Sequence, residues 1–476
     1  MAETIEQTQI AVLGAGPAGY AAAFRAADLG LEVTLIDLDP NPGGTCLYRG
    51  CIPSKALLHV ARAITQAREA EHFGVHYATP RIDVARLREA TRGVVSQMTG
   101  GLGQLSKARK VRYLQGRGSF LESTALRVHK IDGNTVELHY KMCILATGSR
   151  PAIIPDLMPE SPRVMTSTDA LELPDIPARL LVIGGGYIGL ELATVYATLG
   201  ARVTVVEMTP TLLPGVDRDL VRPLAKRMET LCEAIHLNMK VANVEATPNA
   251  VHVEIVDSSG GRSEHDFDRM LVSVGRKPNS SGIGLDNTKV VVNAQGFVEA
   301  GKTMRTADPN ILAIGDVIGQ PMLAHKGTRE GIVAAEVAAG MRSAFDAQCI
   351  PAIVYTDPEI AWVGLTETEA AAKNIATDVG RFPWAASGRA TTFHRTDGLT
   401  KLLVDPATGR ILGVGLVGVG AGELIAEGAL AIEMGATAAD LALTIHPHPT
   451  LSETLMESGE LIHGASTHLY RPKKKS

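Results

Sequence analysis

A glycine-rich turn that occurs twice, each time between an apolar strand and a helix, constrains the fold of this chain more than any other feature. In the first copy, the apolar run Ile10–Leu13 leads into the turn Gly14–Gly19 and then into an alanine-rich helical stretch that reaches Leu29. A second strand, Glu32–Ile36, ends in Asp37. The succession of strand, glycine turn, helix, strand and acid is the fingerprint of a dinucleotide-binding α/β domain. A glycine turn alone is common, and the other elements in register make the fingerprint specific.

The same fingerprint recurs in the middle of the chain. The strand Leu180–Ile183 precedes the turn Gly184–Gly189 and a helix to Leu199, after which the strand Arg202–Val206 ends in Glu207. In both copies the acid lies 18 positions beyond the last glycine. Two copies in register predict two separate α/β domains, each with its own dinucleotide.

The residue types within each copy indicate how a dinucleotide would be held. The glycines allow the backbone to approach a pyrophosphate at the start of the helix, where free N–H groups and the helix dipole favour an anion. Asp37 and Glu207 are placed to accept hydrogen bonds from a ribose. A carboxylate at Glu207 would also repel the 2′-phosphate of NADP, and no arginine stands at the next three positions. The second copy therefore predicts NAD.

Two cysteines, Cys46 and Cys51, lie between the two copies in the stretch Gly43–Lys55. In a regular helix, residues five positions apart are separated by about 7.5 Å of rise, whereas a relaxed disulfide needs its Cα atoms roughly 4.4–6.8 Å apart. The pair can be bridged only where the turn is distorted, which Gly50 permits, and a strained, accessible disulfide is of the readily reduced, catalytic kind. Two ordinary thiols near a helix start are the alternative. Metal ligation is disfavoured, because zinc-binding pairs usually lie closer in sequence and have a second pair elsewhere.

Size and composition limit the classes of function. A chain of 476 residues is too long for one typical core and predicts three or four domains. Its net charge of −5 leaves no basic footprint for nucleic acid, and no apolar run reaches the roughly 18 residues of a membrane span. The acidic residues Met1–Glu6 lack the apolar core of a signal peptide. Three of the five cysteines are scattered and make no secreted disulfide framework, so we expect a cytoplasmic protein.

Two further strands end in turns that could contact a cofactor. The apolar strand Met142–Leu145 leads into a Thr-Gly turn at Gly148, and Ile311–Ile314 leads into Gly315 and Asp316. The first strand is most simply sheet core. The second is either a strand followed by a plain turn, or a strand whose carboxylate contacts the sugar-like portion of the first cofactor. Beyond about Pro351, the sequence indicates an α+β domain with a helix from Ala421 to Met434.

The segment Ile445–Glu453, near the C-terminus, contains two histidines and an acid. One interpretation is a helix cap, with Thr450 as the N-cap and Glu453 three residues on in a capping box. The other is a general base, because a carboxylate five residues after His448 can fix the tautomer of the imidazole and stabilise its protonated form. His446 lies farther from the acid and is the less favoured base. The sequence leaves both interpretations open.

Together these motifs resemble those of the flavoprotein disulfide reductases, and among them the group that oxidises dihydrolipoamide. The likeness runs from about Ile10 to about Thr467. It is most specific in Gly43–Lys55, Ala146–Gly148, Gly315-Asp316, Gln320–His325 and the His448…Glu453 segment. The resemblance implies an α/β fold with two Rossmann-like dinucleotide-binding domains, for FAD and NAD, and a C-terminal α+β dimerisation domain. In order, these would be an FAD-binding domain at 1–150, an NAD-binding domain at 151–277, a central domain that completes the FAD site at 278–349 and an interface domain at 350–476.

The resemblance also implies a role for each candidate residue. FAD would be bound by Gly14, Gly16, Gly19, Asp37, Lys55, Gly148 and Asp316. NAD would be bound by Gly184, Gly186, Gly189 and Glu207, while Glu191 would pair with Lys55 near the reactive edge of the flavin. Cys51 would lie against the flavin ring and Cys46 would face the substrate, with His448 and Glu453 as the base and its carboxylate partner. No metal is implied.

In the implied reaction, His448 takes a proton from dihydrolipoamide, the resulting thiolate attacks Cys46, and Cys51 passes the electrons through FAD to NAD⁺. The implied partners are a second copy of the chain and a 2-oxo acid dehydrogenase complex, whose acyltransferase carries the substrate on a lipoyl domain, or the glycine-cleavage carrier protein. Two alternatives are another NAD(P)H-dependent flavin disulfide reductase, of the glutathione or mercuric type, and a mainly structural subunit of a multienzyme complex. The first would need basic residues near Glu207 or an extra C-terminal cysteine pair, and the sequence has neither.

The sequence departs from the family pattern between the two cysteines. Tyr48 and Arg49 stand where the family usually has Asn-Val. An arginine beside the thiols would favour a thiolate. Alternatively, it points into solvent and has little effect.

Overall fold

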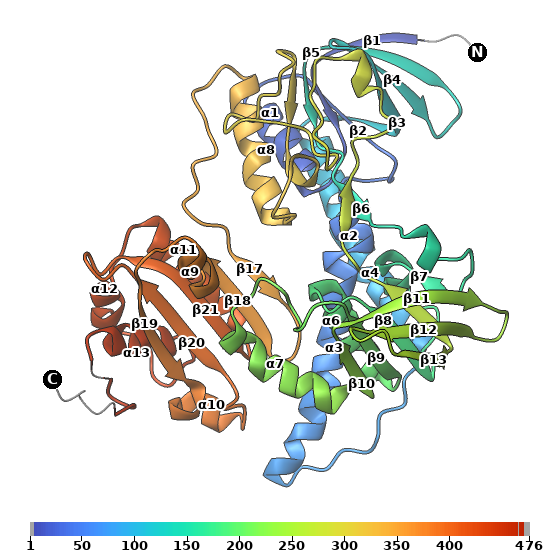
Figure 1. The fold of residues 1–476 in the computed structure, drawn as a ribbon. Coiled ribbons are helices and arrows are strands. Elements are labelled where there is room, and N and C mark those ends of the chain that lie inside the picture. The colour runs from blue at the N-terminus through green and yellow to red at the C-terminus, as the bar shows by residue number, and fades with distance from the viewer. Residues whose placement is uncertain (1–3, 465, 471–476) are drawn as a thin grey trace.

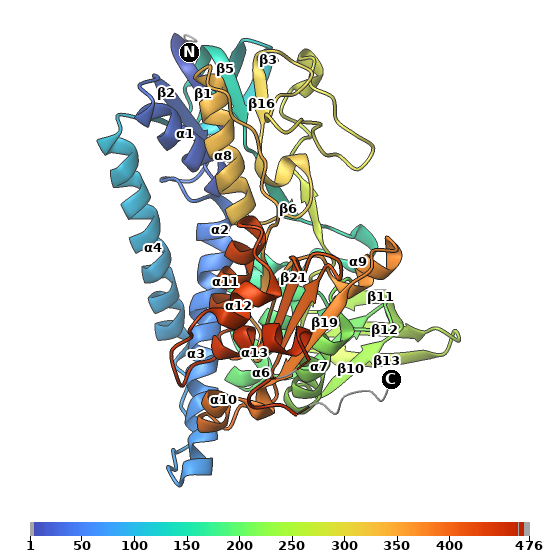
Figure 2. The same ribbon diagram turned by 90° about the vertical axis from the view of Figure 1, so that its left-hand side faces the viewer.

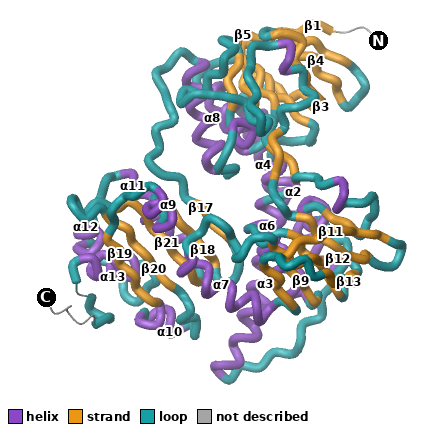
Figure 3. The backbone as a smooth tube through the Cα atoms, viewed as in Figure 1, coloured by secondary structure: helices purple, strands orange, loops and turns teal. Residues whose placement is uncertain are grey.

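The computed structural model describes residues 4–464 and 466–470, which form three units around one long helix (Figures 1 and 2). Figure 3 shows that each unit has its own group of strands. The long helix α3, Cys51–Glu69, begins in the first unit and runs down along the second. Within the described residues, no helix is both long enough and apolar enough to cross a membrane.

The first unit is an α/β unit whose sheet carries the first glycine turn. β1 lies between β2 and β5, β3 follows β2 and β16 follows β5, all parallel, while β4 joins β3 to β5 in antiparallel fashion. The predicted strands before and after the turn are therefore present as neighbours in the sheet. The bounds are β1 Thr4–Leu13, β2 Val33–Asp37, β3 Arg112–Glu122, β4 Ala125–Lys130, β5 Thr135–Leu145 and β16 Ile311–Ala313.

Two helices far apart in sequence cover one face of this sheet. α1, Pro17–Asp28, packs its small buried residues against α8, Ala324–Ala338 (Figure 1). Arg25 of α1 also pairs with Glu336 of α8 at 2.6 Å. The segment 278–349, expected to be a central domain, thus supplies β16, the short 3₁₀ helix η4 (Gly315–Ile318) and α8 to the first unit.

A helical layer connects the first unit to the rest of the molecule. It consists of α2 Gly44–Arg49, α3, the 3₁₀ turn η1 Ala70–Phe73 and α4 Val84–Ala108. Leu57 and Leu58 of α3 belong to the same hydrophobic core as the second unit, which fixes that unit against the helix.

The second unit repeats the α/β plan around the second glycine turn. Its parallel sheet has the order β10-β9-β8-β14-β7, and an antiparallel sheet of β11, β12 and β13 lies beside it (Figure 2). The short pair of β6 Ser149–Pro151 and β15 Arg276–Pro278 lies where the chain enters and leaves the unit. The bounds are β7 Val164–Met165, α5 Ser167–Leu171, β8 Arg179–Ile183, α6 Tyr187–Leu199, β9 Arg202–Glu207, α7 Arg218–Leu231, β10 Ala234–Leu237, β11 Met239–Ala246, β12 Val251–Asp257, β13 Arg262–Phe267 and β14 Arg269–Val272.

The third unit is an antiparallel α+β unit, as predicted for the C-terminal part. Its sheet has the order β17-β18-β21-β20-β19, with α11, α12 and α13 at its outer side and α7 of the second unit near β18 and β21 (Figure 1). The bounds are β17 Ala352–Val354, β18 Glu359–Gly364, α9 Glu367–Ala372, β19 Asp378–Pro383, α10 Gly388–Thr392, β20 Leu399–Val404, β21 Ile411–Gly418, α11 Ala421–Glu433, α12 Ala438–Leu443 and α13 Glu453–Ile462.

Candidate active site

The thiol pair lies at a break between two helices. α2 ends at Arg49, Gly50 adopts φ −147° and ψ −114°, and α3 begins at Cys51. A Cβ at Gly50 would lie 2.8 Å from the carbonyl oxygen of Thr45, so a side chain would clash there. The break brings Cys46 and Cys51 within hydrogen-bonding reach of one another, both as free thiols. The predicted distortion at Gly50 is confirmed, and the disulfide stays a prediction.

The two thiols differ in acidity because one donates to the other. The hydrogen bond from Cys46 lowers the pKa of Cys51, and the charge of Lys55 lowers it further, while burial and Glu191 act in the opposite direction. The same hydrogen bond and burial raise the pKa of Cys46. Cys51 is therefore the residue of the pair that carries the thiolate.

Lys55 is held by a carboxylate from the second unit. Its Nζ lies 2.9 Å from Oε2 of Glu191, whose side chain is only 6% exposed. The other oxygen of Glu191 accepts a hydrogen bond from the backbone N–H of Tyr355 at 3.0 Å, and Lys55 Nζ lies 4.3 Å from the centre of the Tyr355 ring. All three units therefore meet beside the thiols, and Tyr355 is a participant that sequence reasoning missed.

Arg49 takes neither of the orientations weighed for it. Its guanidinium forms a bidentate pair with the carboxylate of Asp39, and its side chain is 40% exposed. The neighbouring Tyr48 donates to the carbonyl oxygen of Asn41 at 3.1 Å. Both residues tie α2 to the segment that follows β2, and Arg49 is not among the main causes of the pKa shift of either thiol.

A cavity of about 1200 Å³ adjoins the thiols. Its wall comes from the first glycine turn, the ends of β2 and β5, α2, η4 and the start of α6, with Ile353 and Tyr355 from the third unit. Nine predicted site residues line it: Gly14, Gly16, Asp37, Cys46, Cys51, Lys55, Gly148, Glu191 and Asp316. A volume of this size is at or above the upper end of common ligand sites, so it suits a large, extended ligand.

The first glycine turn shapes one end of this cavity. A Cβ at Gly19 would lie 1.8 Å from the carbonyl oxygen of Gly14, so only glycine allows α1 to start this close to β1. Gly19 thus supports the turn without lining the cavity. Asp37 accepts hydrogen bonds from the N–H groups of Ala15 at 2.5 Å and Asp39 at 3.1 Å. Burial raises the pKa of Asp37 by more than these bonds lower it.

Asp316 belongs to a polar chain that crosses from the first unit to the second. Its Oδ2 accepts a hydrogen bond from Ser149 at 2.5 Å, and Arg276 donates to the hydroxyl and carbonyl oxygens of Ser149, each at 2.8 Å. Sequence reasoning missed Ser149 and Arg276, although both follow strands whose carboxyl ends are where α/β sheets bind ligands. The buried Glu330 was missed as well, and it accepts a hydrogen bond from the N–H of Gly315 at 2.8 Å.

The second glycine turn repeats the geometry of the first. Gly184 has φ +108°, Gly186 is the N-cap of α6, and a Cβ at Gly189 would lie 2.2 Å from the carbonyl oxygen of Gly184. Glu207 is 7% exposed and accepts hydrogen bonds from the N–H groups of Gly185 at 2.6 Å and Thr209 at 2.8 Å. In both copies the acid is therefore oriented by the second residue of its own turn.

The structure brings His448 and Glu453 together. Nδ1 of His448 lies 2.9 Å from Oε1 of Glu453, and Oε2 of the same carboxylate accepts the N–H of Thr450 at 2.8 Å. Burial raises the pKa of Glu453, but the hydrogen bonds from Thr450 and His448 outweigh it and leave the pKa below its usual range. The alternative base, His446, instead binds Glu427 through Nε2 at 2.7 Å.

The helix-cap interpretation is wrong in its main part. α13 begins at Glu453 with Ser452 as its N-cap, and Thr450 Oγ1 donates to Pro447 rather than accepting from the helix. Only the bond from Thr450 N–H to Glu453 survives from the expected capping box. The acid is therefore free to serve the imidazole with its other oxygen.

The pair formed by His448 and Glu453 lies apart from the cavity of its own chain. Neither residue lines the cavity, and the helices α13 and α2 are separated in both views (Figures 1 and 2). The side chain of His448 is 72% exposed. Within one described chain, the geometry brings together the two thiols and Lys55, but not the thiols and this imidazole.

Comparisons with known proteins agree with this geometry over nearly the whole chain. Residues 8–331 match the pyridine nucleotide-disulphide oxidoreductase family, and residues 350–458 match its dimerisation domain. The chain is 46% identical to a dihydrolipoyl dehydrogenase of Haemophilus influenzae, over 98% of each chain, and 46% identical to one of Halobacterium salinarum, over 97% of each.

Two solved structures share the fold at lower identity. LpdA from Mycobacterium tuberculosis superposes with a TM-score of 0.89 at 29% identity, over 96% of this chain and 99% of that one. The HOCl-induced flavoprotein disulfide reductase RclA from Escherichia coli superposes with a TM-score of 0.84 at 28% identity, over 95% and 99%. The predicted fold class is confirmed. By its sequence and by its fold, this chain belongs to the pyridine nucleotide-disulphide oxidoreductase family.

Proposed function

We propose that this chain is an NAD-dependent dihydrolipoyl dehydrogenase, which oxidises protein-bound dihydrolipoamide through the Cys46–Cys51 pair and FAD. The observation that carries the proposal is the asymmetric thiol pair at the rim of a large cavity, with the pKa of Cys51 lowered by Cys46 and Lys55. Curated relatives that cover nearly the whole chain carry the same name.

The residues around the large cavity fit FAD. The open space beside Gly16, the oriented carboxylate of Asp37 and the turn at Gly148 suit a pyrophosphate and a ribose at one end. At the other end, Lys55 and Cys51 would face the flavin ring, with Asp316 between the two ends. When bound, FAD accepts the electron pair of a dithiol and delivers it as a hydride to NAD⁺. In this proposal residues 1–150 and 278–349 hold FAD.

The proposed proton transfer uses His448 of the partner subunit. Because Nδ1 is bonded to Glu453, the neutral imidazole keeps the lone pair of Nε2 free, and this atom accepts the proton of a substrate thiol. The substrate thiolate attacks Sγ of Cys46 in the oxidised pair, the Cys46–Cys51 bond breaks and Cys51 leaves as the thiolate. The second substrate thiol then attacks the mixed disulfide, which releases oxidised lipoamide and the Cys46 thiol.

The second unit, residues 151–277 in this proposal, would bind NAD. Gly184, Gly186 and Gly189 form the turn, and Glu207 would accept the ribose 2′-OH. The start of α6 reaches the large cavity through Tyr187 and Glu191. A nicotinamide could therefore approach the flavin ring from the second unit.

The proposed assembly is a homodimer formed by the third unit, residues 350–476. This unit exposes several large apolar side chains, Leu430 at 63%, Met434 at 76%, Leu443 at 82% and Ile445 at 96%. Large apolar side chains exposed to this extent are typical of an interface between subunits. In the cell we propose a cytoplasmic location, with the lipoyl domain of a 2-oxo acid dehydrogenase complex or the glycine-cleavage carrier protein as substrate carrier.

Two measurements on the purified protein test this function. Anaerobic titration with dihydrolipoamide should produce the long-wavelength absorption of a thiolate in contact with oxidised flavin, and steady-state turnover should favour NAD⁺ over NADP⁺. Reduction of the flavin by NADPH with glutathione disulfide as the preferred acceptor would contradict the proposal. So would the absence of any dithiol-dependent turnover, which would favour a structural subunit.

A further inference from the structure

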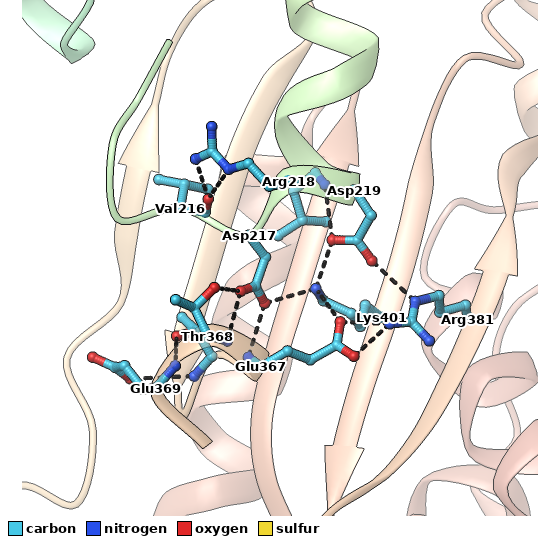
Figure 4. Close-up of polar contacts among 11 residues, drawn as sticks. Val216, Asp217, Arg218, Asp219, Glu367, Thr368, Glu369, Arg381 and Lys401 are labelled. Carbon is cyan, nitrogen blue, oxygen red and sulfur yellow. Dashed lines mark hydrogen bonds and ion pairs between the residues drawn. The ribbon is translucent and has the colours of Figure 1, made fainter. Parts of the chain in front are cut away.

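A buried lysine of the third unit lies among three carboxylates at the border with the second unit (Figure 4). Lys401, on β20, is 1% exposed, and its Nζ lies 2.7 Å from Asp217, 2.7 Å from Asp219 and 2.9 Å from Glu367. Arg381 adds a second cation and donates to Asp219 at 3.0 Å. Carboxylate oxygens of the three acids lie within 4.8 Å of one another, as they would around a metal ion, and the ammonium of Lys401 takes that place.

Asp217 and Asp219, at the start of α7, are the two carboxylates that the second unit contributes to this cluster. Asp217 directly precedes α7, is 4% exposed, and accepts hydrogen bonds from the N–H groups of Glu367 at 3.0 Å and Thr368 at 3.1 Å. Removing Lys401 would leave buried carboxylates facing one another with less positive charge between them. The repulsion between these carboxylates would weaken the contact between α7 and the third unit, because the ammonium of Lys401 had held the two together.

The residue after Asp217 holds a loop of the second nucleotide site. Figure 4 shows Arg218 turned away from the carboxylates toward the preceding loop. Its guanidinium donates to the carbonyl oxygens of Leu212 at 2.9 Å, Leu213 at 2.7 Å and Val216 at 3.0 Å. Five N–H donors in a rigid fork suit donation to several carbonyl oxygens at once. These hydrogen bonds therefore hold the loop 208–216 against the start of α7.

The same loop contacts the second glycine turn. The N–H of Leu213 donates to the carbonyl oxygen of Gly185 at 2.9 Å. At its other end the loop follows Glu207, which binds the N–H of Gly185 and of Thr209. Lys401, Asp217, Arg218, the loop and Gly185 thus form a continuous series of contacts that ends at the proposed ribose site.

We propose that Lys401 is a positioning residue for the second nucleotide site: from the third unit it fixes Asp217, and Arg218 then holds the loop 208–216 against the Gly184–Gly189 turn. Lys401 does not touch the nucleotide. This proposal rests on the proposed binding of NAD beside Glu207. It assigns the third unit a role in nucleotide affinity at the adenosine end of the ligand.

The test measures nucleotide affinity directly in the FAD-containing protein, with EDTA present so that no metal ion replaces the lost ammonium. Lys401→Met removes the charge and keeps the length of the side chain. We expect the dissociation constant of ADP-ribose, measured by calorimetry, to rise about tenfold, and that of NADH to rise by the same factor. FAD content and the rate of flavin reduction by dihydrolipoamide should stay within about twofold of the wild type. The matched control is Lys373→Met, at an exposed lysine beside α9, which should change none of these values.

A second-site variant distinguishes positioning of the loop 208–216 by Lys401 from a general contribution of Lys401 to the stability of the fold. Asp219→Asn in the Lys401→Met background removes one of the facing carboxylates, so it should restore at least half of the lost ADP-ribose affinity, expressed as free energy. If Lys401→Met does not fold, Arg218→Gln tests the same series of contacts from the loop side and should weaken ADP-ribose binding about equally.

The outcomes distinguish this proposal from the function on which it rests. Wild-type protein that binds neither ADP-ribose nor NADH would overturn the nucleotide site itself, and with it the role of Lys401. Normal wild-type binding with unchanged affinity in Lys401→Met, or in Arg218→Gln where that variant replaces it, would overturn the role of Lys401 alone. Equal losses of nucleotide affinity, FAD content and dithiol reduction would also overturn it, because they indicate support of the whole fold.

Discussion

Two cations lie close to the thiol pair in sequence, and their side chains point to different partners. Lys55 lies beside Cys51 and Glu191, whereas Arg49 binds Asp39. Removing the Lys55 charge removes one cause of the lowered Cys51 pKa and leaves Glu191 without its cation. We expect Lys55→Met to shift the pH midpoint of Cys51 alkylation upward by about one unit in the reduced protein. Rates of iodoacetamide reaction between about pH 5 and pH 10 would measure it.

Arg49→Val is the matched control for that prediction, since it restores the residue that the family usually has. It should leave the midpoint almost unchanged, because Arg49 pairs with Asp39 and is not among the main causes of the pKa shift of either thiol. An equal upward shift in both variants would mean that any nearby cation stabilises the Cys51 thiolate, whichever way its side chain points.

At this scale, the sequence predicts residue types better than it predicts their partners. The glycines and acids of both turns lie at their expected places, because strand, turn and helix are local patterns. The direction of Arg49 was not predictable, since its partner lies ten residues away across a bend. Lys55 and Glu191 are 136 residues apart, and only the family resemblance paired them. Ser149, Arg276 and Tyr355 carried no motif that singled them out.

Elements with strong periodicity were predictable, and their ends were less so. α13 begins at Glu453 because the hydroxyl of Thr450 donates to the carbonyl oxygen of Pro447 and does not cap the helix. No local sequence pattern indicates this hydrogen bond. The helix is instead fixed from the sheet, where Thr400 of β20 donates to Thr454 at 2.7 Å and Thr454 donates to Leu451 at 2.7 Å.

We therefore expect Thr454→Val to destabilise the fold. The change leaves the buried hydroxyl of Thr400 without its acceptor and removes one of the two hydrogen bonds that Thr454 donates to the carbonyl of Leu451. The expected loss is about 1–3 kcal/mol in the free energy of unfolding, measured by denaturant titration. Thr392→Val, at an exposed threonine of α10, is the control and should cost less than about 0.5 kcal/mol. Similar losses in both variants would contradict the importance of the Thr400 contact.

The contact between α7 and β20 should depend on pH through Asp219. Burial raises the pKa of Asp219, but the hydrogen bond and charge of Lys401, together with Arg381, outweigh it and leave the pKa lowered. A lowered carboxyl pKa stabilises the fold above its unfolded value and loses that effect as the pH falls through the folded value. The gap in Tm between wild type and Asp219→Asn should therefore be widest near pH 7 and narrow as the pH falls below the ordinary aspartate pKa of about 3.9. A gap that stays constant over this range would show that the ion pair is not its cause.

At the scale of the whole molecule, the thiols and the imidazole of His448 lie apart within one chain. The thiols line the large cavity, while His448 lies in the third unit and faces outward. Local sequence patterns predict neither this separation nor a site that two chains complete together.

Coexpression of Cys46→Ser with His448→Gln tests the shared site. In a mixed dimer one site carries both defects and the other is intact, so random pairing should restore about a quarter of wild-type activity. Each variant expressed alone is the control and should be inactive with dihydrolipoamide. Sites that each lie within a single chain would all carry one defect, and coexpression would then restore nothing.

The outward-facing imidazole of His448 has a consequence for catalysis at low concentration. Under the proposed sharing of sites, a solitary chain would keep the thiols, the flavin cavity and the nucleotide turn, yet no imidazole would lie beside its thiols to accept the substrate proton. Upon dilution below the dimer dissociation constant, dithiol oxidation should fall with the square of the total protein concentration. Electron transfer from NADH to a small dye needs no such base, and it should decline only in proportion to the protein present. The ratio of the two rates would then serve as a direct gauge of association.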